Sequence, residues 1–144
     1  MNQTLWLLAA FCVAANTVHA QPAKGSAEHI RAAVGRIDGK AIQANAKSTA
    51  DWPSYGLDYA ETRFSKLPQI NASNVKGLGL VWSYNLESTR GVEATPLVVD
   101  GIMYVSASWS IVHAVNARTG KRLWTYDPKV NREAGYKGCC DVVN

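Results

Sequence analysis

The stretch that decides the fold runs from Ala94 to Tyr126 and reads ATPLVVDGIMYVSASWSIVHAVNARTGKRLWTY. Apolar and β-branched residues gather in short runs with turn residues between them, which is typical of consecutive strands. The expected strands are residues 94–99, 102–106, 111–115 and 122–126. The dipeptide that follows the first run, Asp-Gly, is typical of a two-residue hairpin turn. The stretch therefore predicts a small antiparallel meander.

Such a meander cannot bury both of its faces by itself, and its outer strands leave backbone groups unpaired. We therefore expect it to be one of several similar units. These units would stack side by side or radially, as the blades of a propeller do.

Residues 1–20 have the composition of a secretory signal peptide. An apolar core runs from Leu5 to Ala15, and Val18-His19-Ala20 suits cleavage before Gln21. The segment before this core contains no Lys or Arg, so a short membrane anchor is the alternative interpretation. Cleavage would deliver a chain without a membrane span to an oxidising compartment.

The length of 144 residues suits one small domain. The formal net charge is +4, and no run of Lys or Arg is present. The charge pattern therefore gives no indication of a nucleic-acid partner.

Residues 21–50 are expected to form one short helix followed by a loop. Ser26 can act as the N-cap of a helix that continues to about Val34. The following segment, Lys40–Ala50, is polar and rich in small residues, which we interpret as a loop. His29 is expected to be an exposed helix residue rather than a ligand.

Residues 51–78 contain several prolines and glycines, which predicts a turn-rich segment. Trp52, Tyr55 and Phe64 are expected to anchor this segment to a core. The next segment, Leu80–Leu86, alternates apolar and polar residues and predicts one more strand before the meander.

Three blocks of sequence resemble a known family, and the third of them is the Cys139-Cys140 pair at its distance behind Glu93. The pattern A-x-N-x-x-T-G-K-x-x-W at residues 114–124 resembles the tryptophan-docking motif of the eight-bladed quinoprotein dehydrogenase propellers. Residues 51–78 are similar to the N-terminal signature of the bacterial pyrroloquinoline quinone (PQQ) dehydrogenases, with departures at Leu57 and just after Leu78. The resemblance implies an all-β fold, with residues 51–144 forming the incomplete start and first blade of an eight-bladed β-propeller.

Glu93 lies at the mouth of the first predicted strand. From the residues alone it is more simply an exposed carboxylate at a strand end. The resemblance instead implies that Glu93 contacts PQQ and orients the polar edge of the quinone.

Cys139 and Cys140 are adjacent, and they are the two cysteines left after signal cleavage. A disulfide between neighbours departs from ordinary disulfide geometry and closes a tight, strained ring. Free thiols, cross-links to other partners or half of a soft metal site are alternatives, although adjacent cysteines suit a zinc site poorly. The resemblance implies a Cys139–Cys140 disulfide that lies against one face of the quinone.

The resemblance is closest to the periplasmic quinohemoprotein alcohol dehydrogenases. It implies the N-terminal part of a longer enzyme that oxidises alcohols to aldehydes or ketones with PQQ and Ca²⁺. Electrons would pass to haem c and a periplasmic acceptor. We assign no catalytic residue and no metal ligand within the 144 residues, and the residues that select the alcohol are expected in later blades. We expect the isolated chain to aggregate or stay partly unfolded, because one blade leaves strand edges and apolar faces exposed.

Two alternatives stay open. One is the methanol dehydrogenase branch, which shares the cysteine pair and has no haem of its own. The other is a non-enzymatic propeller of the outer-membrane assembly type, in which neither the cysteine pair nor the glutamate is expected.

Overall fold

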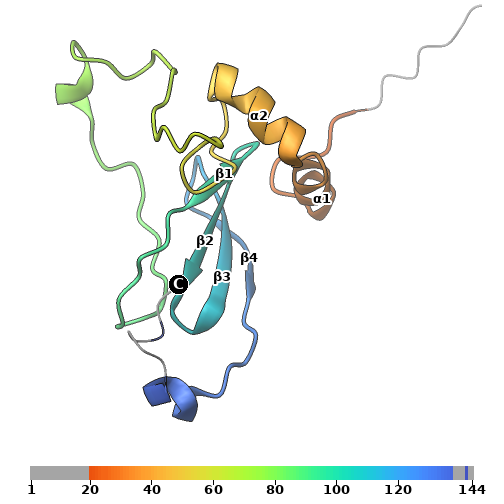
Figure 1. Ribbon diagram of the computed structural model, residues 1–144, viewed down its shortest axis with the longest axis vertical. Helices are drawn as coiled ribbons and strands as arrows, with labels where there is room; N and C mark the ends of the chain where they lie inside the picture. The colour runs from red at the N-terminus through yellow and green to blue at the C-terminus, as the bar shows by residue number, and fades with distance from the viewer. Residues whose placement is uncertain (1–19, 138–141, 143–144) are drawn as a thin grey trace, which may run out of the picture.

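A computed structural model describes residues 20–137 and residue 142 of the chain. Its helices and strands are α1 (Ala27–Gly35), α2 (Gly39–Ser48), β1 (Leu97–Val99), β2 (Ile102–Ala107), β3 (Ile111–Asn116) and β4 (Arg122–Tyr126). Short 3₁₀ turns occupy Val75–Gly77, Ser108–Ser110 and Arg132–Lys137. The four strands pair in chain order, β1-β2-β3-β4, and each neighbouring pair is antiparallel. The predicted meander is therefore confirmed (Figure 1).

The turns of the meander form for the reasons that the sequence indicates. Asp100 and Gly101 join β1 to β2 with φ values of 47° and 76°, the positive values that a type I′ hairpin requires. Gly120 has φ 69° in the turn before β4. The first strand is shorter than expected, because pairing with β2 begins only at Leu97.

The N-terminal region contains two helices, so the expected loop at residues 40–50 is wrong. Ser26 caps α1 as predicted, since its hydroxyl accepts a hydrogen bond from the backbone N–H of His29. Asp38 caps α2 in the same way by accepting from the backbone N–H of Ala41. The small residues of α2 include several alanines, and alanine is the best helix former rather than a loop signal. Among residues 20–137, neither helix is long and apolar enough to cross a bilayer.

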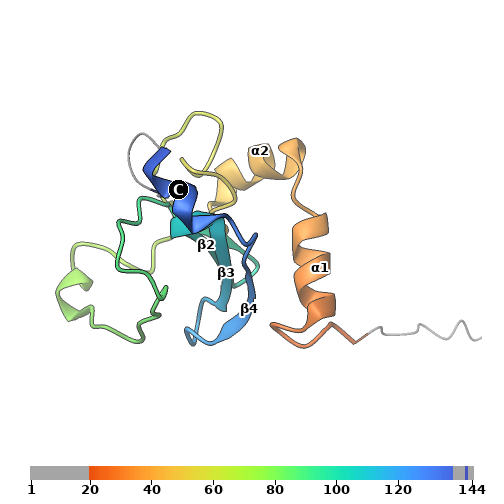
Figure 2. The same cartoon turned by 90° about the horizontal axis from the view of Figure 1, so that it is seen from below.

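Helix α1 covers one face of the meander. Its Ala33 is fully buried against Val99, Ile102 and Ala114 of the strands. Trp124 and other half-buried residues pack around this cluster, which forms the core among the described residues. Figure 2 shows α1 on one side of the strands, while the segment of residues 70–90 lies on the other.

The segment after α2 is anchored differently from the prediction. The backbone of Trp52 pairs with Val98 at the outer edge of β1 through two hydrogen bonds. Leu57 is fully buried, whereas Tyr55 and Phe64 are 53% and 65% exposed. Tyr55 lies at the surface beneath the guanidinium of Arg63. The expected anchoring by Tyr55 and Phe64 is therefore wrong for the described structure.

Residues 80–86 do not form a strand in the described part of the chain. The alternation of side chains is nevertheless present, since Trp82, Tyr84 and Leu86 are half-buried and the two residues between them are exposed. Trp82 donates from its ring N–H to the carbonyl of Ala117, and its ring lies against Gly120. The apolar pattern thus places side chains against the meander, but strand pairing also needs a neighbour that supplies backbone hydrogen bonds.

Candidate functional site

Glu93 lies in the segment that enters β1, and its side chain is exposed. No hydrogen bond or ion pair joins this carboxylate to another described side chain. The segment before it is held by Ser108, which is buried at the end of β2. The Ser108 hydroxyl lies 2.8 Å from the hydroxyl of Ser88 and donates to the carbonyl of Gly91 at 3.2 Å. The structure therefore fixes the chain two residues before Glu93.

The turn between β2 and β3 has an unusual backbone. Trp109 and Ser110 have φ values of 66° and 57°, in the left-handed region that a bulky residue rarely adopts. The guanidinium groups of Arg90 and Arg132 lie over the indole ring, 5.2 and 5.6 Å from its centroid. A flat aromatic plate with two cations thus lies at the same end of the meander as Ser108.

Cys139 and Cys140 lie outside the described residues, but residues on both sides of them contact Trp109. The backbone N–H of Trp109 donates to the carbonyl of Val142 at 3.0 Å. Gly135 lies so close to the indole that a Cβ added to it would be 2.6 Å from a ring carbon. The turn therefore contacts the segment leading to Glu93 and also the residues at 135 and 142, which lie on either side of the cysteines in the sequence.

The sequence did not indicate the roles of Ser108, Trp109 or the two arginines. The available signal was a tryptophan between two serines in a tight turn, where small residues are usual. Among the described residues, no group of three His, Cys, Asp or Glu side chains is placed to hold a metal ion.

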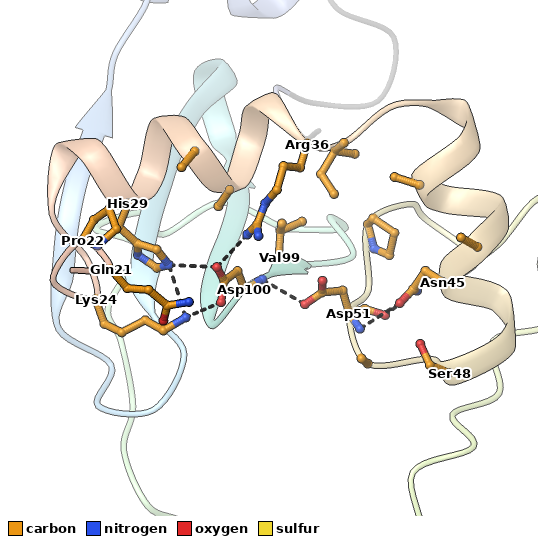
Figure 3. Close-up of a pocket in the computed structure, with 17 residues that line it drawn as sticks. Gln21, Pro22, Lys24, His29, Arg36, Asn45, Ser48, Asp51, Val99 and Asp100 are labelled. Atoms are coloured by element: carbon orange, nitrogen blue, oxygen red, sulfur yellow. Dashed lines mark hydrogen bonds and ion pairs between the residues drawn. The ribbon is translucent and has the colours of Figure 1, made fainter. Parts of the chain in front are cut away.

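A cavity of about 770 Å³ lies elsewhere, between α1, α2 and the β1–β2 turn. Figure 3 shows the side chains of Lys24, His29 and Arg36 converging on Asp100. The Arg36 guanidinium lies 2.8 Å from the Asp100 carboxylate, and Nε2 of His29 lies 3.2 Å from it. Lys24 also contacts this carboxylate. The Lys24 hydrogen bond, followed by those from His29 and Arg36, lowers the pKa of Asp100 to about 2. Asp51 accepts from the Asp100 backbone N–H at 2.9 Å.

His29 is buried, so its predicted exposure is wrong. The backbone N–H of Gly25 donates to its Nδ1 at 2.9 Å, which leaves Nε2 to face Asp100. Burial follows because the Asp100 carboxylate, distant in sequence, supplies a partner for the ring. This cluster joins the helices to the sheet at the β1–β2 turn, whereas Glu93 and Trp109 belong to the opposite end of β2. We therefore interpret the cavity as part of the helix–sheet junction.

A second buried histidine, His113, lies on the face of the meander away from α1. Its Nδ1 is 3.0 Å from the hydroxyl of Tyr84 and 3.3 Å from that of Thr125. Its Nε2 is buried with no hydrogen-bond partner among the described residues. Desolvation lowers the pKa of His113; the charge of Glu87 opposes this effect and that of Arg122 adds to it.

Comparison with known proteins identifies the family of this fold. The pattern of the PQQ family, described as the glucose/ethanol/alcohol dehydrogenase β-propeller domain, matches residues 52–142. A quinohemoprotein alcohol dehydrogenase from Comamonas testosteroni is 66% identical over 143 residues, which are 99% of this chain and 20% of that protein. A 1-butanol dehydrogenase (cytochrome c) from Thauera butanivorans is 66% identical over 94 residues, which are 65% of this chain and 14% of that protein.

Solved structures agree with this assignment. The crystal structure of the Comamonas testosteroni quinohemoprotein alcohol dehydrogenase has a TM-score of 0.76 and 73% identity, covering 78% of this chain and 17% of that one. A europium-containing methanol dehydrogenase has a TM-score of 0.65 and 37% identity, covering 73% of this chain and 19% of that one. The chain spans a fifth or less of the length of these relatives. The meander is the expected propeller blade, and the chain belongs to the PQQ-dependent alcohol dehydrogenase β-propeller family.

Proposed function

We propose that this chain is the N-terminal part of a periplasmic alcohol dehydrogenase that uses PQQ and calcium and passes electrons to haem c. The family membership and the names of its relatives support alcohol oxidation by a quinoprotein. The substrate is a small alcohol, and the product is an aldehyde or ketone. We assign neither the calcium ligands nor the catalytic base to the described residues.

The observation that carries this proposal is the convergence at the turn Ser108–Ser110. Ser108 holds the segment before Glu93, and Trp109 contacts Gly135 and Val142 on either side of the cysteines. Gly91, two residues before Glu93, and the residues at 135 and 142, on either side of the cysteines in the sequence, therefore contact the same turn, which supports the proposal.

The chemistry of the described side chains fits the cofactor. PQQ is a flat quinone that carries carboxylate groups, and when bound it would accept a hydride from the alcohol. The guanidinium of Arg132 over the Trp109 ring makes this end of the blade attractive to an anion. Glu93 projects an exposed carboxylate that can accept hydrogen bonds from a protonated edge of the ring system. We propose that Glu93 orients the cofactor and does not transfer a proton.

The cysteines complete the proposed site. We propose a Cys139–Cys140 disulfide that forms a rigid wall against one face of the quinone. Residues 1–20 would act as a signal peptide, and residues 51–144 would begin the propeller domain. Export to the periplasm would supply the oxidising environment that the disulfide needs. Mass spectrometry of the secreted protein should find Gln21 as the first residue.

The test uses the full-length gene product, purified and reconstituted with PQQ and Ca²⁺. Glu93→Gln should weaken PQQ binding about tenfold, because it removes the charge but keeps the shape of the side chain. Glu87→Gln is the matched control, since this exposed carboxylate makes only a long 3.9 Å pair, with Arg122, among residues 20–137. Failure of the wild-type protein to bind PQQ, or to reduce a dye when given an alcohol, would overturn the proposed function.

The haem-free methanol dehydrogenase type is the second candidate. Its solved representative shares 37% identity with this chain, against 73% for the quinohemoprotein enzyme, and this difference favours the haem-containing type. The absorption spectrum of the purified full-length protein distinguishes the two, because only the haem-containing type shows a reduced cytochrome c band.

A further inference from the structure

We propose that the mature N-terminus is a modification site, where Gln21 cyclises to a pyroglutamyl residue without the help of an enzyme. The inference rests on one part of the proposed function, the removal of residues 1–20 as a signal peptide. It is otherwise independent of the quinone site. The modification would remove the positive charge of the α-amine from the mature protein.

The chemistry needs only a glutamine as the first residue. The neutral α-amine attacks Cδ of its own side chain, and the new C–N bond closes a small lactam ring. The bond between Cδ and the amide nitrogen breaks, and this nitrogen leaves as ammonia after taking up the proton that the amine loses. Nothing is oxidised or reduced, and no co-reactant is consumed. Part of the α-amine is neutral at about pH 7, so the reaction proceeds in ordinary buffer.

The residues that follow Gln21 are anchored to the sheet and to α1. Pro22 is half-buried. Gly25 packs on β4, since a Cβ added to it would lie 2.9 Å from the side chain of Leu123. The backbone N–H of Gly25 also donates to Nδ1 of His29 at 2.9 Å. These contacts fix where the mature chain begins, at the rim of the cavity between α1, α2 and the β1–β2 turn.

Gln21 itself is exposed, although it contributes to the lining of this cavity. Figure 3 shows it among the side chains that surround the cavity. Within residues 20–137, no hydrogen bond or ion pair joins the Gln21 side chain to another residue. Chain ends that nothing holds in place keep their conformational freedom. The side chain is therefore free to turn back onto its own α-amine.

A folded chain slows this reaction when a carboxylate pairs with the α-ammonium, because the protonated amine is not a nucleophile. Two carboxylates line the cavity, those of Asp51 and Asp100. The Asp100 carboxylate is already contacted by three basic side chains, and Asp51 accepts the backbone N–H of Asp100. Lys24 and Arg36 line the same cavity, and like charges disfavour the protonated form of an amine. We therefore expect the terminus to react as freely as it does in a short peptide.

The experiment uses full-length protein in two preparations. In the first, the protein is secreted with its own residues 1–20, and peptide mass spectrometry identifies its N-terminal peptide. In the second, a cleavable leader replaces residues 1–20, and a protease removes it so that Gln21 becomes the first residue. Conversion is then followed over time as the loss of one ammonia molecule from the mass of the N-terminal peptide. The second preparation does not depend on signal cleavage.

We expect the secreted protein to begin with a cyclised Gln21. In the second preparation, the rate constant should lie within about twofold of that of a synthetic peptide with the sequence of residues 21–26, because the fold does not hold the terminus. Gln21→Asn is the matched control. Its shorter side chain would have to close a more strained ring, so its α-amine should stay free in both preparations.

A free α-amine that persists in the second preparation while the peptide cyclises would overturn the proposal, because it would show that the folded chain protects the terminus. A secreted protein that begins with an uncyclised Gln21 would overturn the modification alone. A secreted protein that begins at another residue would overturn the signal-peptide assignment together with the modification. None of these results bears on PQQ binding or alcohol oxidation, which are tested separately.

Discussion

Replacing Gly120 with alanine should loosen the last two strands of the blade far more than the same change at another turn glycine. Gly120 has φ 69°, and a Cβ there would lie 2.6 Å from the ring of Trp82. Gly101 has φ 76°, but a Cβ there meets nothing within 4 Å. Both substitutions therefore introduce backbone strain, and only Gly120→Ala also introduces a clash.

The expected loss of local stability is the sum of the backbone strain and the clash with Trp82. An L-residue in the left-handed conformation costs about 1–2 kcal/mol in local stability. Overpacking against the Trp82 ring costs about 1–3 kcal/mol more. The clash also threatens the hydrogen bond from the Trp82 ring N–H to the Ala117 carbonyl, now 3.2 Å long. We expect Gly120→Ala to lower the local free energy of opening by at least about 1 kcal/mol more than Gly101→Ala does.

Native-state hydrogen exchange of full-length protein measures this difference directly, because it reports local opening without requiring a two-state transition. Peptides that cover β3 and β4 should exchange at least about fivefold faster in Gly120→Ala than in Gly101→Ala. Equal exchange in the two variants would refute the reasoning, since it would show that Trp82 does not occupy the space in front of Gly120.

Three further predictions concern the cap of α1 and two ionisable groups; the first is measured by hydrogen exchange and the other two by melting of the full-length protein. Ser26→Ala should lower the stability of α1 by about 1 kcal/mol through loss of its N-cap, seen as faster exchange of its first turn, with Ser48→Ala unchanged. The pKa of Asp100 is lower in the folded chain than its ordinary 3.8, so its contribution is complete above pH 4 and is lost as the pH falls toward 2. Asp100→Asn should therefore lower the melting temperature at pH 6 and flatten its decline between pH 4 and 2; an unchanged decline would contradict the ion cluster. The pKa of His113 is lowered from 6.5, so the unfolded chain takes up more protons and stability falls on acidification below pH 6.5. His113→Gln should reduce that fall, and an identical pH profile would show that the folded histidine titrates normally.

Local sequence signals were sufficient to predict those parts of the structure that depend on residues close together in the chain. The Asp100-Gly101 turn formed as predicted because its positive φ values are available to these residue types without help from distant contacts. The cap of α1 also formed as predicted, since Ser26 reaches the backbone of His29 within one helical turn. The prediction was wrong for α2, because its small and polar residues were interpreted as a loop. Asp38 provides an N-cap for this helix, and its alanines favour helix formation.

The prediction failed where a side chain depends on partners distant in sequence. His29 is buried because Asp100 lies against it. Phe64 is exposed, although its aromatic side chain suggested an anchor to the core. Residues 80–86 alternate as a strand does but have no strand neighbour among the described residues. Alternation shows which side chains can share a face, but it does not identify the neighbouring strand.

The sequence by itself determined the four-stranded meander, its turns and the family resemblance, because these follow from local backbone preferences and short motifs. It also indicated Glu93 and the cysteine pair as candidates, whose roles are still proposals. Only the tertiary structure brought the segment before Glu93 and the residues on either side of the cysteines to Ser108 and Trp109. The physical reason is that antiparallel pairing carries Ala107 to one end of the sheet, where segments distant in sequence meet and pack together.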